Sequence, residues 1–251
     1  MSTRNCLVTG ASRGIGRVIA ARLSAAGHRV ALTARSADQL AEVAGKLPGQ
    51  ALTLPADVTD PAAVNATFRV IEKEWGAVDV LVLNAGTALS KPISVLTDEE
   101  WQSQLDLNLS APFRFMRRAI PAMVERGWGR IVVIASIAAK VGEADIAAYT
   151  ASKHGVLGLV RSAAAELART GVTVNAICPG YVDTPMTDGN VEMLAARTGR
   201  SRDDIRHALE RKHPIRRLIT TDEVADAVEL CLLSAAITGQ GINVDGGAVQ
   251  S

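Results

Sequence analysis

The stretch "NCLVTGASRGIG" (Asn5–Gly16) carries a short apolar run directly into a turn that is rich in glycine. Gly10, Gly14 and Gly16 precede an alanine-rich segment that we expect to be helical. Glycine tolerates the unusual dihedral angles of a strand-to-helix turn, and the missing side chains let the backbone approach an anion at the helix N-terminus. The spacing G-x3-G-x-G differs from the commoner G-x-G-x-x-G, and a glycine cluster alone can be only a tight turn. Its place at the first strand–helix junction favours a site for the pyrophosphate of a dinucleotide.

Short runs of the same apolar, β-branched kind recur along the chain between helix-like segments. After the first, they are "RVALT" (Arg29–Thr33), "ALTLP" (Ala51–Pro55), "VDVLVLN" (Val78–Asn84), "GRIVVIAS" (Gly129–Ser136), "GVTVNAICP" (Gly171–Pro179) and "GINVD" (Gly241–Asp245). Strands that alternate with helices predict parallel βαβ units, and strands that are apolar throughout are typical of a sheet covered on both faces. The sequence therefore predicts an α/β fold with a doubly wound parallel sheet of about seven strands.

Length and composition fit one such domain over residues 1–251. The hydrophobic share is 48% but aromatic residues make up only 3%, so Ala, Val, Ile and Leu must fill the interior. The one compositional change is the polar, helix-prone segment Pro185–Arg217, which holds three more basic than acidic residues. We expect it to be a helical insertion that covers the substrate.

The overall charge excludes some classes of partner. Lys and Arg total 27 against 26 Asp and Glu, so no global field attracts nucleic acid or a membrane surface. Cys6, Cys178 and Cys231 are widely spaced and flanked by apolar residues, which favours buried free thiols in a reducing compartment over disulfides or a metal site. The N-terminal region shows no apolar signal segment, and no apolar run is long enough to span a bilayer. We therefore expect a cytoplasmic protein without a metal.

The end of the second strand indicates which dinucleotide binds. In dinucleotide-binding folds an acidic residue at this point bonds the ribose 2′-hydroxyl, but Ala34 and Arg35 stand there. With Arg13 of the glycine turn, Arg35 can hold a 2′-phosphate, which predicts NADPH/NADP. The alternative is that both arginines are only solvated residues near helix starts.

A serine, a tyrosine and a lysine occur in "SIAAKVGEADIAAYTASK" (Ser136–Lys153), a stretch of mostly small residues. Tyr149 and Lys153 are four residues apart and would share one helical face. Ser136 follows a strand at the carboxyl edge of the sheet, where ligands of parallel sheets bind. A neighbouring ammonium favours the phenolate, so we expect the lysine, the helix end and the charge of the cofactor together to lower the pKa of Tyr149 and make it a better proton donor and acceptor near neutral pH. A serine hydroxyl can hold a substrate carbonyl.

These motifs together resemble the short-chain dehydrogenase/reductase family over nearly the whole chain. The matching elements are "TGASRGIG" (Thr9–Gly16), "ADV" (Ala56–Val58), "NAG" (Asn84–Gly86), Asn108 in "LDLNLSAPF", Ser136, "YTASK" (Tyr149–Lys153), "NAICPGYVDTPM" (Asn175–Met186) and "GINVDGG" (Gly241–Gly247). The resemblance implies a Rossmann fold and an oxidoreductase. It also implies that Tyr149 is the general acid/base, Lys153 its modulator and a ribose ligand, Ser136 the carbonyl holder, and Asn108 the support of a proton-relaying water.

The resemblance extends the expected cofactor site well beyond the glycine turn. The residues concerned are Gly10, Ser12, Arg13, Gly14, Ile15, Gly16, Arg35, Ser36, Asp57, Val58, Asn84, Ala85, Gly86, Tyr149, Lys153, Pro179, Gly180, Val182 and Thr184. The resemblance also implies a homotetramer, and we expect the apolar helix that contains Tyr149 to form its contact surface.

Within the family the chain looks like the 3-oxoacyl thioester reductases and the polyketide ketoreductases. Such reductases that act on carrier proteins have docking arginines where this chain has Gly127 and Thr170, which favours a free coenzyme A ester over an acyl carrier protein. The arginines of Pro185–Arg217 either face the anionic handle of coenzyme A or form a solvated helix face: Arg197, Arg200, Arg202, Arg206 and Arg211. A secondary-alcohol or steroid dehydrogenase stays open. A cofactor-sensing regulator without activity is disfavoured, because it usually lacks the tyrosine and the lysine.

Overall fold

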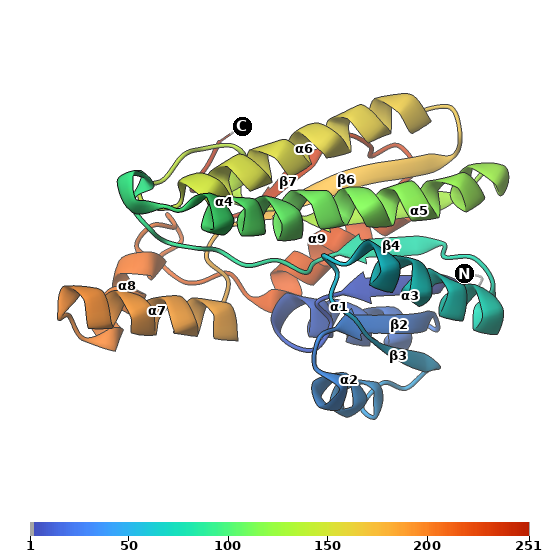
Figure 1. Ribbon diagram of the computed structural model, residues 1–251, viewed down its shortest axis with the longest axis horizontal. Helices are drawn as coiled ribbons and strands as arrows, with labels where there is room; N and C mark the ends of the chain where they lie inside the picture. The colour runs from blue at the N-terminus through green and yellow to red at the C-terminus, as the bar shows by residue number, and fades with distance from the viewer. Residues whose placement is uncertain (1–2, 251) are drawn as a thin grey trace.

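The computed structural model describes residues 3–250, which form one parallel sheet of seven strands between two layers of helices (Figure 1). The strands are β1 (Asn5–Thr9), β2 (Arg29–Ala34), β3 (Ala51–Pro55), β4 (Val80–Leu83), β5 (Gly129–Ile134), β6 (Val172–Pro179) and β7 (Gly241–Val244). Each lies in one of the seven apolar runs. The predicted α/β doubly wound sheet is therefore confirmed.

The strand order is β3-β2-β1-β4-β5-β6-β7, so the chain changes direction across the sheet after β3. Helix α3 (Pro61–Trp75) carries the chain back to place β4 on the free side of β1. At such a switch point the connections after neighbouring strands leave toward opposite faces of the sheet, and a crevice opens at their carboxyl ends. The glycine turn after β1 and the segment after β4 lie at this crevice.

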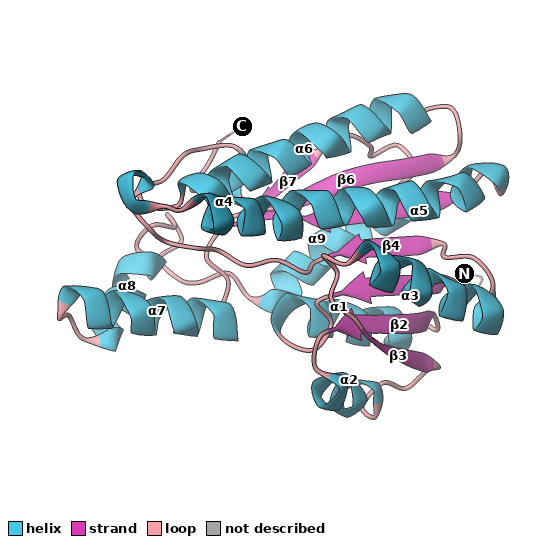
Figure 2. Cartoon of the chain, in the orientation of Figure 1, coloured by secondary structure: helices cyan, strands magenta, loops and turns pink. Residues whose placement is uncertain are grey.

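Helices cover both faces of the sheet (Figure 2). On one face, α1 (Gly14–Ala25), α2 (Ala37–Ala44) and α9 (Thr221–Leu233) share a hydrophobic core with one side of the strands. On the other, α3 packs beside α5 (Ala111–Glu125), α5 packs beside α6 (Ala147–Leu167), and α4 (Asp98–Leu105) lies against α6. Every residue of β1 and β5 is buried, which is why these runs are apolar without alternation.

Three short helical turns interrupt the regular pattern at the carboxyl side of the sheet. They are η1 (Ile93–Val95), η2 (Asp106–Ser110) and η3 (Ile137–Ala139). The second is a π-turn that joins α4 to α5, and it contains Asn108. π-turns inside helices are rare and often mark functional positions. Hydrophobic periodicity does not reveal them.

Helices α7 (Pro185–Thr198) and α8 (Arg202–Glu210) occupy the segment for which the sequence predicts a helical insertion. In Figure 1 they lie apart from the other helices, to the left of the sheet. They have a small apolar core of their own, formed by Val191, Ile205, Leu209 and Leu218. Pro185 begins α7, and Gly199 ends it with a φ of 71°. Between residues 3 and 250, no helix is both long and apolar enough to cross a membrane.

Candidate active site

The glycine turn after β1 is anchored by Asn84, which follows β4. The Asn84 Nδ2 donates to the carbonyl oxygens of Thr9 (3.0 Å) and Gly10 (3.1 Å). Gly10 and Gly14 have φ values of 63° and 54°, a region that favours glycine. A Cβ on Gly16 would lie 2.4 Å from the Gly10 carbonyl oxygen and 2.5 Å from Asn84 Nδ2. A side chain at this position would therefore push the turn off its anchor.

The N-terminus of α1 has no side-chain cap, unlike most helices of this fold. Ser36, Asp60 and Thr184 cap α2, α3 and α7, whereas Arg13 at the start of α1 makes no capping hydrogen bond. The first backbone N–H groups of α1 thus remain available to an anion. Together with the tight glycine turn, this arrangement fits the pyrophosphate of a dinucleotide.

Two arginines lie where the 2′-phosphate of the cofactor is expected. Arg13 and Arg35 are both exposed, and no acidic side chain of residues 3–250 forms an ion pair with either. Arg35 follows directly after Ala34, the last residue of β2. The pKa of the nearby Asp57 carboxyl is lowered, mainly by a hydrogen bond from the Thr59 hydroxyl and less by the charge of Arg35. Both guanidinium groups are therefore unoccupied by protein carboxylates.

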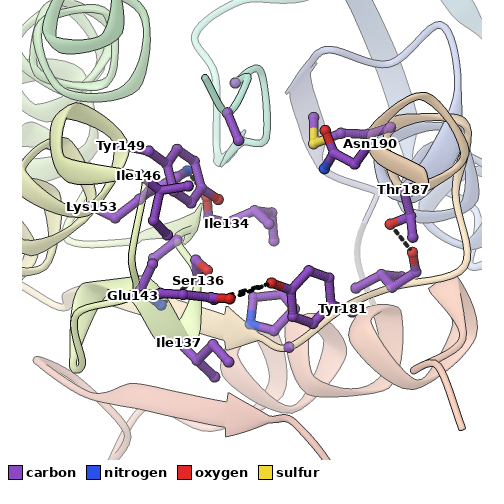
Figure 3. Close-up of a pocket in the computed structure, with 18 of the residues that line it drawn as sticks. Ile134, Ser136, Ile137, Glu143, Ile146, Tyr149, Lys153, Tyr181, Thr187 and Asn190 are labelled. Carbon is purple, nitrogen blue, oxygen red and sulfur yellow. Dashed lines mark hydrogen bonds between the residues drawn. The ribbon is translucent and has the colours of Figure 1, made fainter. Parts of the chain in front are cut away.

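A cavity of about 490 Å³ opens at the carboxyl edge of the sheet (Figure 3). The predicted site residues that line it are Ile15, Asn84, Gly86, Ser136, Tyr149, Lys153, Pro179, Gly180, Val182 and Thr184. The other predicted residues do not line this cavity: Gly10, Ser12, Arg13, Gly14, Gly16, Arg35, Ser36, Asp57, Val58, Ala85 and Asn108. Most of the second group belongs to the glycine turn and to the ends of β2 and β3, where the adenosine half of a dinucleotide is expected.

Ser136, Tyr149 and Lys153 converge on this cavity, as the sequence predicts. The Ser136 side chain hydrogen-bonds to Tyr149 and also accepts from the backbone N–H of Ala138 (3.1 Å), which caps η3. Lys153 is 5% exposed, and its Nζ donates to the carbonyl oxygen of Ile134 (2.9 Å) at the end of β5. The same Nζ lies 5.6 Å from the centre of the Tyr149 ring. The lysine is thus oriented by the strand end and stands beside the phenol.

In the protein without cofactor, the lysine alone does not lower the pKa of the tyrosine. Burial raises the pKa of Tyr149 to about 12, and the hydrogen bond from Ser136 offsets only part of this effect. Burial also lowers the pKa of Lys153 to about 8, because a desolvated ammonium is costly. Desolvation of the phenolate therefore dominates in the protein without cofactor, and the phenol is protonated at neutral pH.

Replacing Lys153 with methionine should stabilise the protein without cofactor at pH 7 by about 2 kcal/mol, because it removes a buried ammonium. The lysine pKa falls from 10.5 when exposed to about 8 when buried. The free-energy cost of burying the charged lysine is fully present below pH 8. It disappears as the pH rises toward 10.5, because the folded protein then holds a neutral amine. Urea unfolding of both proteins at pH 7 and pH 10 checks this. A gap that does not shrink at pH 10, or one no larger than that of the exposed change Lys46→Met, would contradict it.

Asn108 lies behind the cavity, in the π-turn η2. Its Oδ1 accepts from the Thr87 backbone N–H (3.2 Å), and its Nδ2 donates to the Thr87 carbonyl oxygen (3.0 Å). A Cβ on Gly86 would lie 2.8 Å from Asn108 Oδ1 and 3.6 Å from Lys153 Nζ. The π-turn thus brings the asparagine close to the lysine, and Gly86 leaves the space between them open.

Several residues that shape the site were not predicted. The Thr9 hydroxyl accepts from the backbone N–H groups of Asn84 (2.9 Å) and Ala85 (3.0 Å) and holds this segment against β1. Glu143, Tyr181 and Lys212 line the cavity. Tyr181 belongs to the quoted motif around Pro179 and Gly180, so the motif could have indicated it. No sequence signal connects Glu143 with Lys212, which lies 69 residues away.

The arginines of Pro185–Arg217 are mostly neutralised within the protein. Arg206 pairs with Asp183 (2.7 Å) and Asp188 (3.0 Å). Arg197 pairs with Asp145 (3.2 Å), and Arg202 with Glu192 (2.8 Å). Of the two interpretations of this segment, the structure favours a surface of ion pairs. Only Arg200 and Arg211 of the five lack an ion pair with the described residues.

Among residues 3–250, this site includes neither a candidate metal site nor a disulfide. Residues 3–250 contain no group of three or more His, Cys, Asp or Glu side chains that could hold a metal ion. The three cysteines are free and buried, as predicted.

Known proteins resemble this chain along its length. The family model for short chain dehydrogenases matches residues 4–195. The granaticin polyketide synthase putative ketoacyl reductase 1 of Streptomyces violaceoruber is 39% identical, over 96% of this chain and 91% of its own. The 3-oxoacyl-(acyl-carrier-protein) reductase of Escherichia coli is 37% identical, over 96% of this chain and 95% of its own.

A solved structure agrees with these sequence relatives. The crystal structure of an actinorhodin polyketide ketoreductase variant with NADPH superimposes with a TM-score of 0.93 at 38% identity, and covers 98% of this chain and 97% of its own. The family match over most of the chain and the identity to these relatives establish that the proteins are homologous. The chain is an oxidoreductase that belongs to the short-chain dehydrogenase/reductase family.

Proposed function

We propose that this protein reduces a ketone to a secondary alcohol with NADPH, and that its substrate is a 3-oxoacyl thioester. The observation that carries the proposal is the convergence of Ser136, Tyr149 and Lys153 on one cavity beside the glycine turn. We also propose that residues 1–251 act as one catalytic domain, with α7 and α8 covering the substrate, and that it works in the cytoplasm.

The cavity residues would divide the work on the carbonyl group. The reduced nicotinamide, when bound, supplies the hydride. Tyr149 donates its phenolic proton to the carbonyl oxygen, and the Ser136 hydroxyl hydrogen-bonds the same oxygen as negative charge develops there. Lys153 stabilises the phenolate that remains and holds the ribose, so Lys153→Ala should weaken cofactor binding as well as slow turnover. Asn108 would support the water through which the phenol regains a proton.

The raised pKa of Tyr149 suits the direction of reduction. A general acid must be protonated to act, and a pKa of about 12 keeps the phenol protonated over the physiological range. Alcohol oxidation needs the phenolate instead. We therefore expect oxidation to accelerate as the pH rises above neutral, while reduction does not require high pH.

The proposal of NADPH rests on two arginines that no protein carboxylate occupies. Arg13 and Arg35 stay exposed beside Ala34, a residue that neither repels a phosphate nor accepts from a 2′-hydroxyl. The related actinorhodin ketoreductase was crystallised with NADPH. Both observations support the phosphorylated cofactor.

Of the two thioester handles, we favour coenzyme A. Gly127 and Thr170 offer no charge to a carrier protein, and the neighbouring Arg126 pairs with Asp79 (3.2 Å). The support from the segment of α7 and α8 is weaker than the sequence suggested, because most of its arginines are paired. Relatives named as polyketide ketoacyl reductases make a cyclic or polyketide ketone the second candidate.

A substrate panel tests the proposal. NADPH oxidation should be measured with acetoacetyl-coenzyme A, with the same acyl group on a carrier protein, and with a cyclic ketone. We expect turnover of at least one ketone, and the highest kcat/KM with the coenzyme A ester. No turnover of any ketone would overturn the proposed reaction. A preference for the carrier-protein ester would overturn only the choice of coenzyme A, and a preference for the cyclic ketone would overturn the thioester substrate.

We also propose a homotetramer. Large apolar side chains are exposed on and before α4, α5 and α9, among them Ile93 (75% exposed), Phe113 and Leu233 (62%). Helix α6, which the sequence analysis favoured as the contact surface, exposes no large hydrophobic side chain. Two-fold pairing of the exposed helices would bury these residues in a closed assembly. Light scattering at micromolar concentration should give about four times the chain mass of 26.3 kDa, and a value near 26.3 kDa would refute it.

A further inference from the structure

A polar cluster lies on the wall of the cavity next to Ser136, and the reaction described above does not use it. We name it the Glu143 cluster, and it consists of Glu143, Tyr181 and Lys212. The Tyr181 hydroxyl donates to the Glu143 carboxylate (3.0 Å), and the Lys212 ammonium donates to the Tyr181 oxygen (3.2 Å) and to Glu143. Figure 3 shows the Glu143 carboxylate reaching the Tyr181 hydroxyl close to Ser136 and Tyr149. The three side chains come from three separate segments of the chain.

The cluster is held in place from behind. The backbone N–H of Tyr181 donates to Nε2 of the fully buried His213 (2.9 Å), whose Nδ1 donates to the Arg217 carbonyl oxygen (2.7 Å). A Cβ on Gly180 would lie 2.3 Å from His213 Nε2, so only glycine permits this approach. The backbone of Tyr181 and the residue next to Lys212 are thereby fixed relative to each other. The cavity wall is pre-organised before a substrate enters.

The cluster differs from the other ion pairs of this region because it faces the cavity. The walls around it are largely apolar, with Ile137, Val141, Ile146 and Val182 among the lining residues. The Lys212 and Glu143 side chains are 46% and 37% exposed, so water reaches the pair from the cavity side when no substrate is bound. A substrate with only hydrocarbon at this position would remove water from the cluster and put nothing in its place.

The hydrogen-bonding capacity of the cluster is incomplete. An ammonium has three donors, and Lys212 uses two of them within the cluster. The Tyr181 oxygen donates once and accepts once. A donor therefore remains for an oxygen that enters the cavity. The charges of Glu143 and Lys212 cancel, so the wall suits a neutral carbonyl better than a carboxylate or phosphate.

We propose that the Glu143 cluster binds a second carbonyl oxygen of the substrate, near the ketone that is reduced. The preferred substrates are then dicarbonyl compounds, such as 3-oxoacyl thioesters and diketones, rather than simple ketones. This inference rests on the proposed ketone reduction and adds residues that determine its specificity. Lys212 acts as the specificity residue, because its ammonium holds the spare donor, and Glu143 and Tyr181 position that ammonium.

A matched pair of ketones tests the inference. One is a cyclohexanedione whose two carbonyls flank a dimethyl carbon, so that it cannot enolise there, and the other is the dimethyl cyclohexanone that lacks the second carbonyl. The quantity measured is the ratio of kcat/KM for the diketone to kcat/KM for the monoketone. When this ratio is compared between variants, the difference in intrinsic reactivity between the two ketones cancels.

We expect Lys212→Met and Tyr181→Phe to lower the ratio ~10-fold or more, since the first removes the charged donor and the second removes one of the two partners that hold it in place. The kcat/KM for the monoketone should stay within about threefold of the wild type, because this substrate does not reach the cluster. Asp145→Asn is the matched control. It breaks the ion pair with Arg197 on the same loop as Glu143, and asparagine tolerates the φ of 64° at this position. It should leave the ratio unchanged.

Two results would overturn the inference. An unchanged ratio in Lys212→Met and Tyr181→Phe, including an equal loss with both ketones, would mean that the cluster only holds the loop. A ratio that falls as much in Asp145→Asn as in the two cluster variants would also mean that the cluster only holds the loop. If the wild type reduces the monoketone but the two variants do not lower the ratio, the specificity role fails and the proposed reaction stands. If it reduces neither cyclic ketone but does reduce acetoacetyl-coenzyme A, the preference for diketones fails and the proposed reaction stands. The reaction itself fails only if acetoacetyl-coenzyme A and the other ketones are not reduced either.

Discussion

Replacing Tyr149 with phenylalanine should lower kcat for ketone reduction ~10²- to 10⁴-fold while NADPH still binds. The change removes only the hydroxyl that hydrogen-bonds to Ser136 in the cavity wall. Burial keeps this hydroxyl protonated, and it is the group that hydrogen-bonds to Ser136, whereas the Tyr181 hydroxyl is already bonded to Glu143. The remaining rate would come from binding and orientation of the ketone beside Ser136.

Cofactor affinity provides the control for this experiment. NADPH binding measured by the quenching of protein fluorescence should be similar in Tyr149→Phe and the wild type, because the ring and Lys153 remain. A variant that keeps more than about a tenth of the wild-type kcat, with the chemical step limiting the rate, would show that Tyr149 is not the acid.

The wild type should use NADPH ~10²- to 10³-fold better than NADH, because Arg13 and Arg35 can each give the 2′-phosphate a charged hydrogen bond. The double change Ala34→Asp with Arg35→Leu should reverse this preference. An aspartate at the end of β2 repels the phosphate and accepts from a free 2′-hydroxyl, and the leucine removes one of the two guanidinium groups. The measurement is kcat/KM for both cofactors with one ketone at saturation.

The matched control is Arg69→Leu, which removes an exposed arginine from α3. It should leave the cofactor preference unchanged. If the wild type shows comparable kcat/KM with NADPH and NADH, Arg13 and Arg35 are only solvated surface residues, and the phosphorylated cofactor is not favoured.

The fold could be predicted from the sequence because its strands are buried on both faces. Runs such as those of β1 and β5 are buried at every position and largely apolar, and they end at glycine turns or helix starts, so their type and order are visible locally. The predicted strands 78–84 and 129–136 continue past the observed ends at Leu83 and Ile134. Asn84 and Ser136 leave the sheet there, because their polar side chains bond the glycine turn and η3 instead.

The site could be predicted only in part, since some of its features depend on residues far apart in the sequence. The motif of Tyr149 and Lys153 is local, and its convergence with Ser136 followed from the edge of a parallel sheet. The π-turn at Asn108 and the Glu143 cluster depend on tertiary packing, which leaves no periodicity to detect. Whether the pKa of Tyr149 is raised or lowered depends on the balance between burial and nearby charge. The spacing in the sequence indicates only the nearby charge and not the burial.

The most direct measurement follows the hydrogen that the cofactor delivers. The protein should be given acetoacetyl-coenzyme A and NADPH that carries deuterium at the transferable position of the nicotinamide, and the product should be analysed by mass spectrometry and NMR. The account predicts a 3-hydroxyacyl product with one deuterium on the former ketone carbon, and a large loss of this product in Tyr149→Phe. A product without deuterium at that carbon, or deuterated product formed equally well by Tyr149→Phe, would contradict it.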